Sequence, residues 1–207
     1  MARILALAGV NGAGKSSLLG AMLREDGIPW FNPDSFTHAL VRQGWPPAEA
    51  NAEAWQEGRR RLERALADGH DHVFETTLGG NTLPALLRQA CAHHEVAIWF
   101  CGLSSVDLHL ERVAARVARG GHDIPEARIR QRYDAARANL IDLIPHLAAL
   151  HVHDNSRPAD ADGHATPLLV LDMDRDGLRY PRAIEELAQV PDWAKPIVMA
   201  ALRARGR

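Results

Sequence analysis

Residues 9–16, Gly-Val-Asn-Gly-Ala-Gly-Lys-Ser, match the phosphate-binding pattern G-x-x-x-x-G-K-[ST]. The glycines let backbone N–H groups point at phosphate oxygens, and the positive end of the helix that follows adds to the attraction. We expect the Lys15 ammonium to contact the β- and γ-phosphates and the Ser16 hydroxyl to bind Mg²⁺. ATP and Mg²⁺ are therefore the expected cofactors, with nucleotide contacts from Gly9, Asn11, Gly12, Ala13, Gly14, Lys15, Ser16 and Ser17.

Two carboxylates follow short apolar segments that read as strands. Asp34 comes after Ile-Pro-Trp-Phe-Asn-Pro, and Glu75 ends His-Val-Phe-Glu. A kinase needs a group at the carboxyl edge of its sheet to accept the proton of the substrate hydroxyl, and Asp34 fits that position. A helix cap or turn is the alternative role for Asp34. Glu75 is placed to reach Mg²⁺ through water or to contact the substrate, and an exposed strand-end acid is its alternative.

Arginines form a stripe along one face of the predicted helix at residues 106–119. This stripe consists of Arg112, Arg116 and Arg119, and a second predicted helix carries Arg128, Arg130 and Arg132. Gly120-Gly121 ends the first helix. Guanidinium groups bind phosphate in a bidentate manner, so the pattern predicts a mobile lid at about residues 112–132. A solvated helix face is the alternative for any single arginine, and the sequence leaves open which of them contact phosphate.

These residues need a scaffold, and the chain alternates short apolar runs with longer helical patterns, as β-α-β units do. Strands are expected at residues 3–9, 29–32, 72–75, 96–102, 150–153 and 168–172. Helices are expected at residues 15–25, 47–67, 83–93, 106–119, 125–144 and 181–188. Since no linker or repeat divides the chain, we expect a single P-loop α/β domain of the kinase type over residues 1–207. Its sheet should be mostly parallel and flanked by helices.

Composition excludes several classes of partner. The net charge of −2 provides no basic surface for a nucleic acid or a membrane. No apolar run approaches the ~18 residues of a membrane span. Cys91 and Cys101 lack C-x-x-C spacing, and two reduced thiols suit the cytoplasm. The chain has no N-K-x-D, which argues against guanine selectivity, and no L-S-G-G-Q, which argues against a transporter ATPase.

Further segments occur in the order found in one family: Asn32-Pro-Asp-Ser-Phe36, Phe74-Glu-Thr-Thr-Leu78, and residues 119–125, 129–133 and 154–156. Over residues 3–156 the chain resembles the zeta-toxin family of P-loop kinases and the related predicted small ATPases. The resemblance implies ATP-dependent phosphorylation of a UDP-linked amino sugar such as UDP-N-acetylglucosamine, and an antitoxin protein as a candidate partner. It implies a general base at Asp34, substrate contacts from Glu75 and Thr77, a phosphoryl clamp from Arg112 and Arg119, and Asn155 on the adenine side.

Two other functions stay open at this level. One is a nucleoside or other metabolite kinase, and the other is an ATP-gated switch that transfers no phosphoryl group to a metabolite.

Two weaker motifs that resemble metal sites are better explained as parts of strands and turns. The pairs His70/His72 and His151/His153 lack a third metal ligand. Residues 172–183 resemble a Ca²⁺ loop but carry Ala183 where a bidentate Glu belongs, so we expect a strand and turn there.

Overall fold

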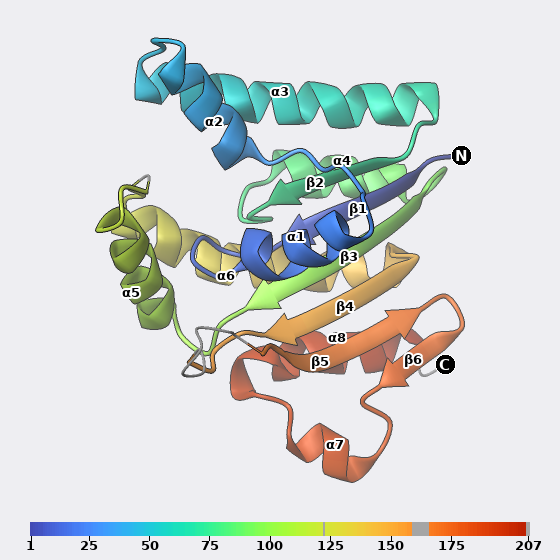
Figure 1. Cartoon of the computed structure of the whole chain (residues 1–207). Helices are drawn as coiled ribbons and strands as arrows, with labels where there is room; N and C mark the ends of the chain where they lie inside the picture. The colour runs from blue at the N-terminus through green and yellow to red at the C-terminus, as the bar shows by residue number, and fades with distance from the viewer. Residues whose placement is uncertain (122, 159–165, 206–207) are drawn as a thin grey trace.

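The computed structural model describes residues 1–121, 123–158 and 166–205, in which helices and strands alternate along most of the chain (Figure 1). The strands are β1 (Arg3–Ala8), β2 (His72–Thr76), β3 (Glu95–Gly102), β4 (Ala149–Asp154), β5 (Leu168–Asp174) and β6 (Gly177–Tyr180). The helices are α1 (Lys15–Glu25), α2 (Pro33–Arg42), α3 (Pro47–Asp68), α4 (Thr82–Ala90), α5 (Val106–Val117), α6 (Glu126–Leu143), α7 (Ile184–Ala188) and α8 (Lys195–Arg205). Two short 3-10 helices are η1 (Ile144–His146) and η2 (Asp192–Ala194).

Within the described residues the strands form one six-stranded sheet in the order β2-β1-β3-β4-β5-β6. The pairs that join β2, β1, β3 and β4 are parallel, whereas β5 and β6 are antiparallel to their neighbours. The expectation of a mostly parallel α/β sheet is therefore confirmed. Neither β6 nor α8 was predicted from the sequence, because both are short and follow the regular part of the pattern.

Both faces of the central strands are covered, which explains why they read as continuous apolar runs rather than alternating ones. Ile4, Ala6 and Ala8 of β1 pack into the larger core on one face, while Leu5 and Leu7 contact the cluster that includes Leu23 of α1. Figure 1 shows α1 in front of the sheet and α4, α6 and α8 behind it. This covering fixes the end of β1, and thus the phosphate-binding loop, between two packed layers.

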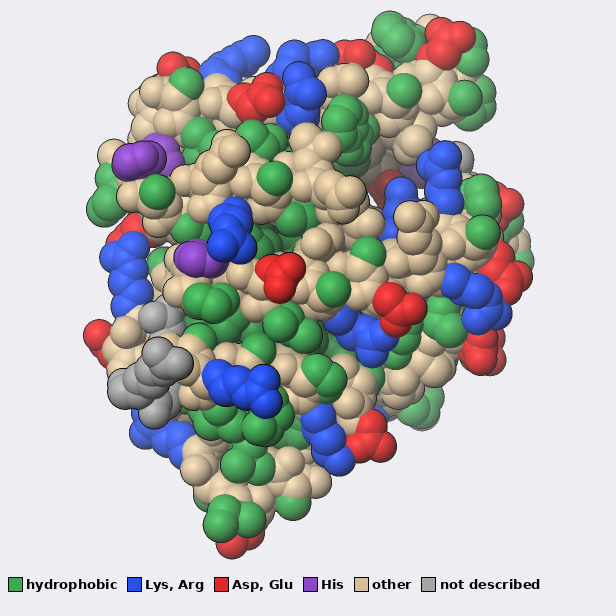
Figure 2. All heavy atoms as spheres, turned by 180° about the vertical axis from the view of Figure 1, so that it is seen from behind, with side chains coloured by type: hydrophobic (Ala, Val, Ile, Leu, Met, Phe, Trp, Pro, Cys, Tyr) green, Lys and Arg blue, Asp and Glu red, His purple; other side chains and the backbone are tan. Residues whose placement is uncertain are grey.

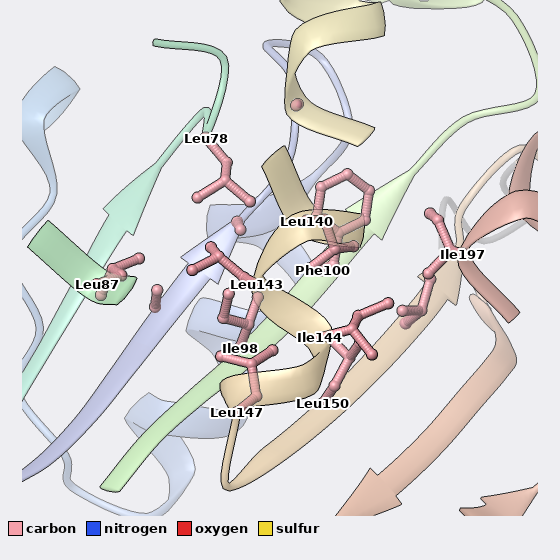
Figure 3. Packing of buried hydrophobic residues seen from close by; sticks show 14 of the residues in the cluster. Leu78, Leu87, Ile98, Phe100, Leu140, Leu143, Ile144, Leu147, Leu150 and Ile197 are labelled. Carbon is pink, nitrogen blue, oxygen red and sulfur yellow. The ribbon is translucent and has the colours of Figure 1, made fainter. Parts of the chain in front are cut away.

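Helix α6 contributes four buried residues to the larger core behind the sheet: Ile129, Ala136, Leu140 and Leu143. Leu140 and Leu143 of α6 are almost fully buried and face Ile98 and Phe100 of β3 (Figure 3). Ile197 of α8 and Leu87 of α4 extend the cluster to either side. Each such side chain stabilises the fold by about 1.5–3 kcal/mol on burial. The arginine-bearing half of α6 is anchored as well, because Ile129 is buried in the same core and Arg132 contacts Asn11.

The expected strand at residues 29–32 is wrong. Phe31 forms a single parallel bridge with Phe74, in which its N–H donates to the Val73 carbonyl and its carbonyl accepts from Glu75. The pairing stops there because Asn32 begins a helix: its side chain accepts a hydrogen bond from the Ser35 N–H at 3.0 Å, and Pro33 occupies the first turn. Helix α2, absent from the prediction, therefore carries Asp34 in its first turn.

Other expectations hold with shifted ends. The strand that carries Glu75 lies beside the P-loop strand, with Leu7 of β1 opposite Glu75 in the register. The helix expected at 181–188 is confined to Ile184–Ala188, and the segment that resembled a Ca²⁺ loop is the turn between β5 and β6. Among the residues that the structure describes, every helix is too short or too polar to traverse a bilayer.

Candidate active site

The loop at residues 9–14 leaves β1 and enters α1, and it is packed tightly on both sides. A Cβ atom at Gly9, where φ is +140°, would overlap the carbonyl oxygen of Cys101 in β3. A Cβ atom at Gly12, where φ is +84°, would lie 2.9 Å from the carbonyl oxygen of His109 in α5. Glycine is required at both positions because of the backbone angle and because no space remains. The loop is thus shaped before any phosphate arrives.

Two side chains support the loop from below through the Ala13 carbonyl oxygen. The Cys101 thiol donates to it at 3.0 Å and the Asn155 amide donates at 2.9 Å. Burial raises the pKa of Cys101 to about 12, so the thiol keeps its proton and acts as a donor. Asn155 is buried where it contacts the loop, and its place on the adenine side, which the resemblance implied, stays a prediction. Its contact explains the geometry of the phosphate loop.

Asn11 links the loop to both arginine-bearing helices. Its backbone oxygen lies 2.8 Å from Nδ1 of His109, and its side-chain oxygen accepts from Arg132 of α6 at 2.8 Å. Burial lowers the pKa of His109 to about 4, so the imidazole is neutral at pH 7, and the contact to a carbonyl requires Nδ1 to carry the proton. Sequence reasoning did not select His109, because a histidine among apolar helix residues carries no spacing signal.

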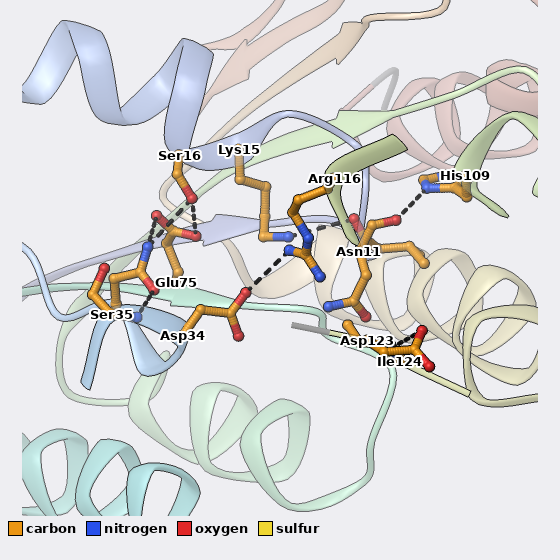
Figure 4. Close-up of polar contacts among 12 residues, drawn as sticks. Asn11, Lys15, Ser16, Asp34, Ser35, Glu75, His109, Arg116, Asp123 and Ile124 are labelled. Atoms are coloured by element: carbon orange, nitrogen blue, oxygen red, sulfur yellow. Dashed lines mark hydrogen bonds and ion pairs between the residues drawn. The ribbon is translucent and has the colours of Figure 1, made fainter. Parts of the chain in front are cut away.

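The Ser16 hydroxyl and the Glu75 carboxylate form the corner where Mg²⁺ would bind. Ser16 donates to Oε2 of Glu75 at 2.9 Å (Figure 4). Trp30 and Asn32 donate to Oε1 at 3.0 and 2.9 Å. Adjacent hydroxyl and carboxylate oxygens suit Mg²⁺, which takes one or two protein ligands and completes its shell with phosphate and water. Among the residues that the structure describes, no group of three or more His, Cys, Asp or Glu could hold a metal ion.

The Lys15 side chain turns back toward its own loop, with Nζ 3.4 Å from the Val10 carbonyl oxygen. Desolvation lowers the pKa of Lys15, and the carboxylates of Glu75 and Asp34 act in the opposite direction. Figure 4 shows the ammonium in the space between Ser16 and Arg116. A cation in that place is available to the outer phosphates of a nucleotide bound in the loop.

Asp34 faces this space from the opposite side. Nη1 of Arg116 lies 3.5 Å from its Oδ2, and the two side chains are 37% and 52% exposed respectively. The other two arginines of the stripe lie elsewhere: Arg112 donates to the Arg157 carbonyl oxygen at 3.3 Å, and Arg119 is exposed beyond the end of α5. Of the three arginines, Arg116 is the one that contacts Asp34, and the phosphoryl clamp expected from Arg112 and Arg119 stays a prediction.

Thr77 lies in a turn that follows β2 and is braced by α6. Its hydroxyl accepts from the Gly79 N–H at 3.4 Å, and Asn139 donates to the carbonyl oxygens of Leu78 and Gly80 at 2.7 and 3.0 Å. Leu78 is fully buried with φ of 56°, a conformation that a leucine adopts only when its surroundings enforce it. Thr77 is thereby held at the same carboxyl edge of the sheet as Glu75.

Ser17, the last of the expected nucleotide contacts, is exposed in the first turn of α1.

The chain is similar in sequence or in fold to several known proteins. A family model described as an AAA domain (AAA_33) matches residues 4–138. A protein of Haemophilus influenzae without an assigned function is 29% identical over 126 residues, covering 60% of this chain and 88% of its own. The solved AvrRxo1-ORF1:AvrRxo1-ORF2 complex with sulphate ions contains a chain of the same fold, with a TM-score of 0.63 at 18% identity over 93% of this chain. This chain spans 65% of the length of that one.

A second solved structure belongs to the PezAT chromosomal toxin–antitoxin system of Streptococcus pneumoniae. Its TM-score is 0.52 at 15% identity, covering 79% of this chain and 69% of that chain. At such identities the likeness concerns the fold alone. The predicted resemblance to P-loop kinases of the zeta-toxin type is confirmed at that level.

Proposed function

The chain belongs to the AAA-domain family whose model matches residues 4–138, and on this premise we propose that it is an ATP- and Mg²⁺-dependent kinase. The γ-phosphoryl group is transferred to a hydroxyl of a small acceptor, which we take to be a nucleotide sugar such as UDP-N-acetylglucosamine. A kinase-like P-loop fold is compatible with this proposal and with the two alternatives, a kinase of another metabolite and an ATP-gated switch. The acceptor and the roles of individual residues are the parts proposed here.

One observation carries the proposal: a carboxylate faces the phosphate loop across the space that contains Lys15 and Arg116. A switch that only binds ATP has no need of a proton acceptor directed at that space from a separate helix, and an ATPase would direct it at water rather than at an acceptor. A kinase requires one, because the attacking hydroxyl must lose its proton as the bond to phosphorus forms.

Each residue of the site has a separate role in the proposed phosphoryl transfer. Lys15 and Arg116 balance the negative charge that spreads over the transferring phosphoryl oxygens. Ser16 and Glu75 would hold Mg²⁺, which supplies charge neutralisation at the β- and γ-phosphates when bound. Asp34 accepts the proton of the acceptor hydroxyl, whose oxygen forms a bond to the γ-phosphorus while the bond to the β,γ-bridging oxygen breaks. The products are ADP, the phosphorylated acceptor and a proton held by Asp34.

Incubation with ATP, Mg²⁺ and a panel of nucleotide sugars, nucleosides and simple sugars tests the proposal. Mass spectrometry should show the gain of one phosphoryl group on a nucleotide sugar, matched mole for mole by ADP. ATP hydrolysis that proceeds at the same rate with and without every acceptor would instead establish an ATPase or an ATP-gated switch. Phosphorylation of a nucleoside alone would retain a kinase and replace the acceptor.

The likeness to a toxin–antitoxin system supports a further part of the proposal, namely that the activity is harmful and is restrained by a protein partner. Expression in a bacterial host should then arrest growth with the wild-type chain and not with Lys15→Ala, at equal protein levels. Equal growth of both cultures would remove the toxin interpretation and leave the kinase intact.

A further inference from the structure

Asp34 and the candidate Mg²⁺ ligands belong to different parts of the fold. Ser16 lies in the first turn of α1 and Glu75 lies in β2, whereas Asp34 lies in α2. Helix α2 packs along α3, and Figure 1 shows this hairpin along the β2 edge of the sheet. A proton acceptor that is misplaced by about 1 Å can lower a rate 10²-fold. The hairpin must therefore be held at a fixed place relative to Ser16 and Glu75.

Packing and charge around Asp34 provide little of this hold. The hairpin borders a hollow of about 140 Å³, whose lining includes Asp34 and residues 120–121 (Figure 2, upper right). The contact between Asp34 and Arg116, at 3.5 Å, joins two side chains that are 52% and 37% exposed. Such a pair contributes little to stability because water competes for both charges. The anchor for this end of α2 must lie on the side of the sheet.

Asn32 contacts both parts of the site with one side chain. Its Nδ2 atom donates to Oε1 of Glu75 at 2.9 Å and to the Ser16 hydroxyl oxygen at 3.3 Å. Its Oδ1 atom accepts from the Ser35 N–H at 3.0 Å and caps α2, in which Asp34 lies two residues further on. An amide offers donors at one end and an acceptor at the other, so this orientation serves both parts at once.

The bonds at Ser16 also orient its hydroxyl for Mg²⁺. Ser16 donates its proton to Oε2 of Glu75 at 2.9 Å and accepts from Asn32, which leaves one lone pair of the hydroxyl oxygen for a cation. Partners that orient a metal ligand in this way typically change metal affinity or activity by roughly 10–100-fold when they are substituted. The Asn32 amide suits this place because it gives Glu75 a donor without adding a charge.

Helix capping alone does not account for these contacts. Serine, aspartate and asparagine cap helices about equally well, yet of the three only asparagine combines a capping oxygen with an NH₂ group. Trp30 also donates to Oε1 of Glu75, at 3.0 Å, so that oxygen has a partner without Asn32. What Asn32 adds is a connection between this carboxylate and helix α2.

We propose that Asn32 is a positioning residue, which holds the helix that carries Asp34 at a fixed place relative to the Mg²⁺ ligands Ser16 and Glu75. The inference rests on the proposed kinase function and adds to it the contact that aligns the base with the metal. Asn32 acts through its neighbours and takes no part in the proton transfer itself. Binding of Mg²⁺ and nucleotide should therefore restrain α2 even without an acceptor.

Hydrogen exchange on the full chain tests this connection without an acceptor. With a non-hydrolysable ATP analogue bound, the amides of residues 34–42 should exchange at least about 3-fold more slowly in Mg²⁺ than in EDTA. Asn32→Ser keeps a capping oxygen and removes the NH₂ group, so it should lose this protection. Trp30→Phe removes the other donor to Glu75 and leaves the connection, so it should keep the protection.

Three results of this experiment would overturn the proposal. The first is a wild-type α2 that exchanges equally fast in Mg²⁺ and in EDTA. The second is protection that persists in Asn32→Ser. The third is protection that is lost in Trp30→Phe as well, because the effect would then act through Glu75 alone.

Turnover distinguishes alignment from capping. At saturating ATP, Mg²⁺ and acceptor, Asn32→Ser should lower kcat roughly 10–100-fold and change the KM for the acceptor by no more than about 3-fold. Asn32→Ala, which also loses the cap, should show the same fall in kcat and a lower melting temperature than Asn32→Ser. A wild-type kcat in Asn32→Ser would show that Asn32 serves only as a cap, and the proposal would be wrong.

Trp30→Phe is the control for stability in the same assay. It should lower the melting temperature at least as much as Asn32→Ser, because an indole is lost along with a hydrogen bond, and it should lower kcat less. An equal fall of kcat in the two variants would contradict the proposal.

Exchange and turnover together separate two failures. If no acceptor is phosphorylated but Asn32→Ser removes the Mg²⁺-dependent protection of α2, the kinase proposal fails and the connection through Asn32 stands. If transfer occurs and Asn32→Ser has wild-type exchange and kcat, the kinase stands and the role of Asn32 falls.

Discussion

The two sides of the candidate site are built differently. On the nucleotide side, buried residues from four segments hold the loop: Cys101 of β3 and Asn155 after β4 contact Ala13, His109 of α5 contacts Asn11, and Glu75 of β2 contacts Ser16. On the acceptor side, Asp34 and Arg116 are 52% and 37% exposed and contact one another at 3.5 Å across two separate helices. The first side is part of the core, whereas the second is an arrangement of surface side chains.

This difference shows which property each side must preserve. Phosphate binding depends on backbone N–H groups in one geometry, and a loop packed without spare volume keeps that geometry at no further cost on binding. The acceptor side must admit and release a substrate, so its contacts are few and weak. An exposed pair such as Asp34–Arg116 contributes at most about 1 kcal/mol to stability. Substitution of an exposed residue on the acceptor side should therefore lower turnover and leave stability unchanged, whereas substitution of the hydrogen-bonded Glu75 on the nucleotide side should lower both.

The largest effect is expected on the acceptor side, from Asp34→Asn. The amide keeps the size of the side chain and cannot accept the acceptor proton, so turnover should fall roughly 10²–10⁴-fold while stability stays within about 0.5 kcal/mol. ATP affinity with Mg²⁺ and with EDTA, measured beside acceptor turnover, checks this. Asp68→Asn at the exposed end of α3 is the control. Turnover within a few-fold of wild type would remove Asp34 as the base.

Lys15→Ala should lower ATP turnover while the protein stays folded. The Lys15 ammonium contacts a single carbonyl oxygen and is not part of the apolar core, so the circular dichroism spectrum and melting temperature should be retained. Loss of one preorganised cation should lower ATP turnover by on the order of 10²–10³. Lys195→Ala, which changes the other lysine of the chain, should leave turnover intact. Wild-type turnover in Lys15→Ala would contradict the nucleotide assignment itself.

Glu75→Gln should lower both nucleotide binding and the free energy of unfolding, unlike Asp34→Asn and Lys15→Ala. The carboxylate accepts from Ser16, Trp30 and Asn32, and an amide cannot accept from all three. We expect the free energy of unfolding to fall by about 1–3 kcal/mol and Mg²⁺-dependent ATP binding to weaken by roughly 10-fold. Denaturant titration and calorimetry measure the two quantities. Glu63→Gln on α3, where the glutamate pairs with Arg59, should cost no more than about 0.5 kcal/mol.

The smallest of these effects concerns pH. Since the pKa of His109 is lowered to about 4, the unfolded chain binds a proton between pH 6.5 and 4 that the native state does not. Stability is therefore highest above pH 6.5 and falls as the pH is lowered, with a contribution from His109 of about 2 kcal/mol between pH 7 and pH 5. His109→Asn should be less stable than the wild type at pH 7, but its free energy of unfolding should fall less steeply as the pH is lowered. Urea unfolding at each pH measures this free energy.

The pKa values of His72 and His153 are lowered as well, because both side chains are partly buried. They add to the decline with acid in the wild-type chain and in His109→Asn alike. The difference between the two slopes therefore isolates His109. Parallel slopes would mean that the imidazole is not held neutral beside Asn11.

The sequence by itself determined the phosphate loop, the mostly parallel α/β fold and the strand that carries Glu75. These features are local. The phosphate loop needs glycine at positions 9 and 12 because of the backbone angles there. Strands β1 and β3 are continuous apolar runs because both faces of the sheet are buried. Asp34 was placed at the correct edge for an incorrect reason, because Asn32-Pro33 begins a helix and does not end a strand.

Only the tertiary structure decided which side chains meet. Ser16 and Glu75 are 59 residues apart, Asp34 and Arg116 are 82 apart, and Asn11 and His109 are 98 apart. Strand order, register and the packing of α5 and α6 on the sheet fix these pairs, and no residue spacing encodes them. Arg116 therefore could not be distinguished from Arg112 and Arg119 on one helix stripe.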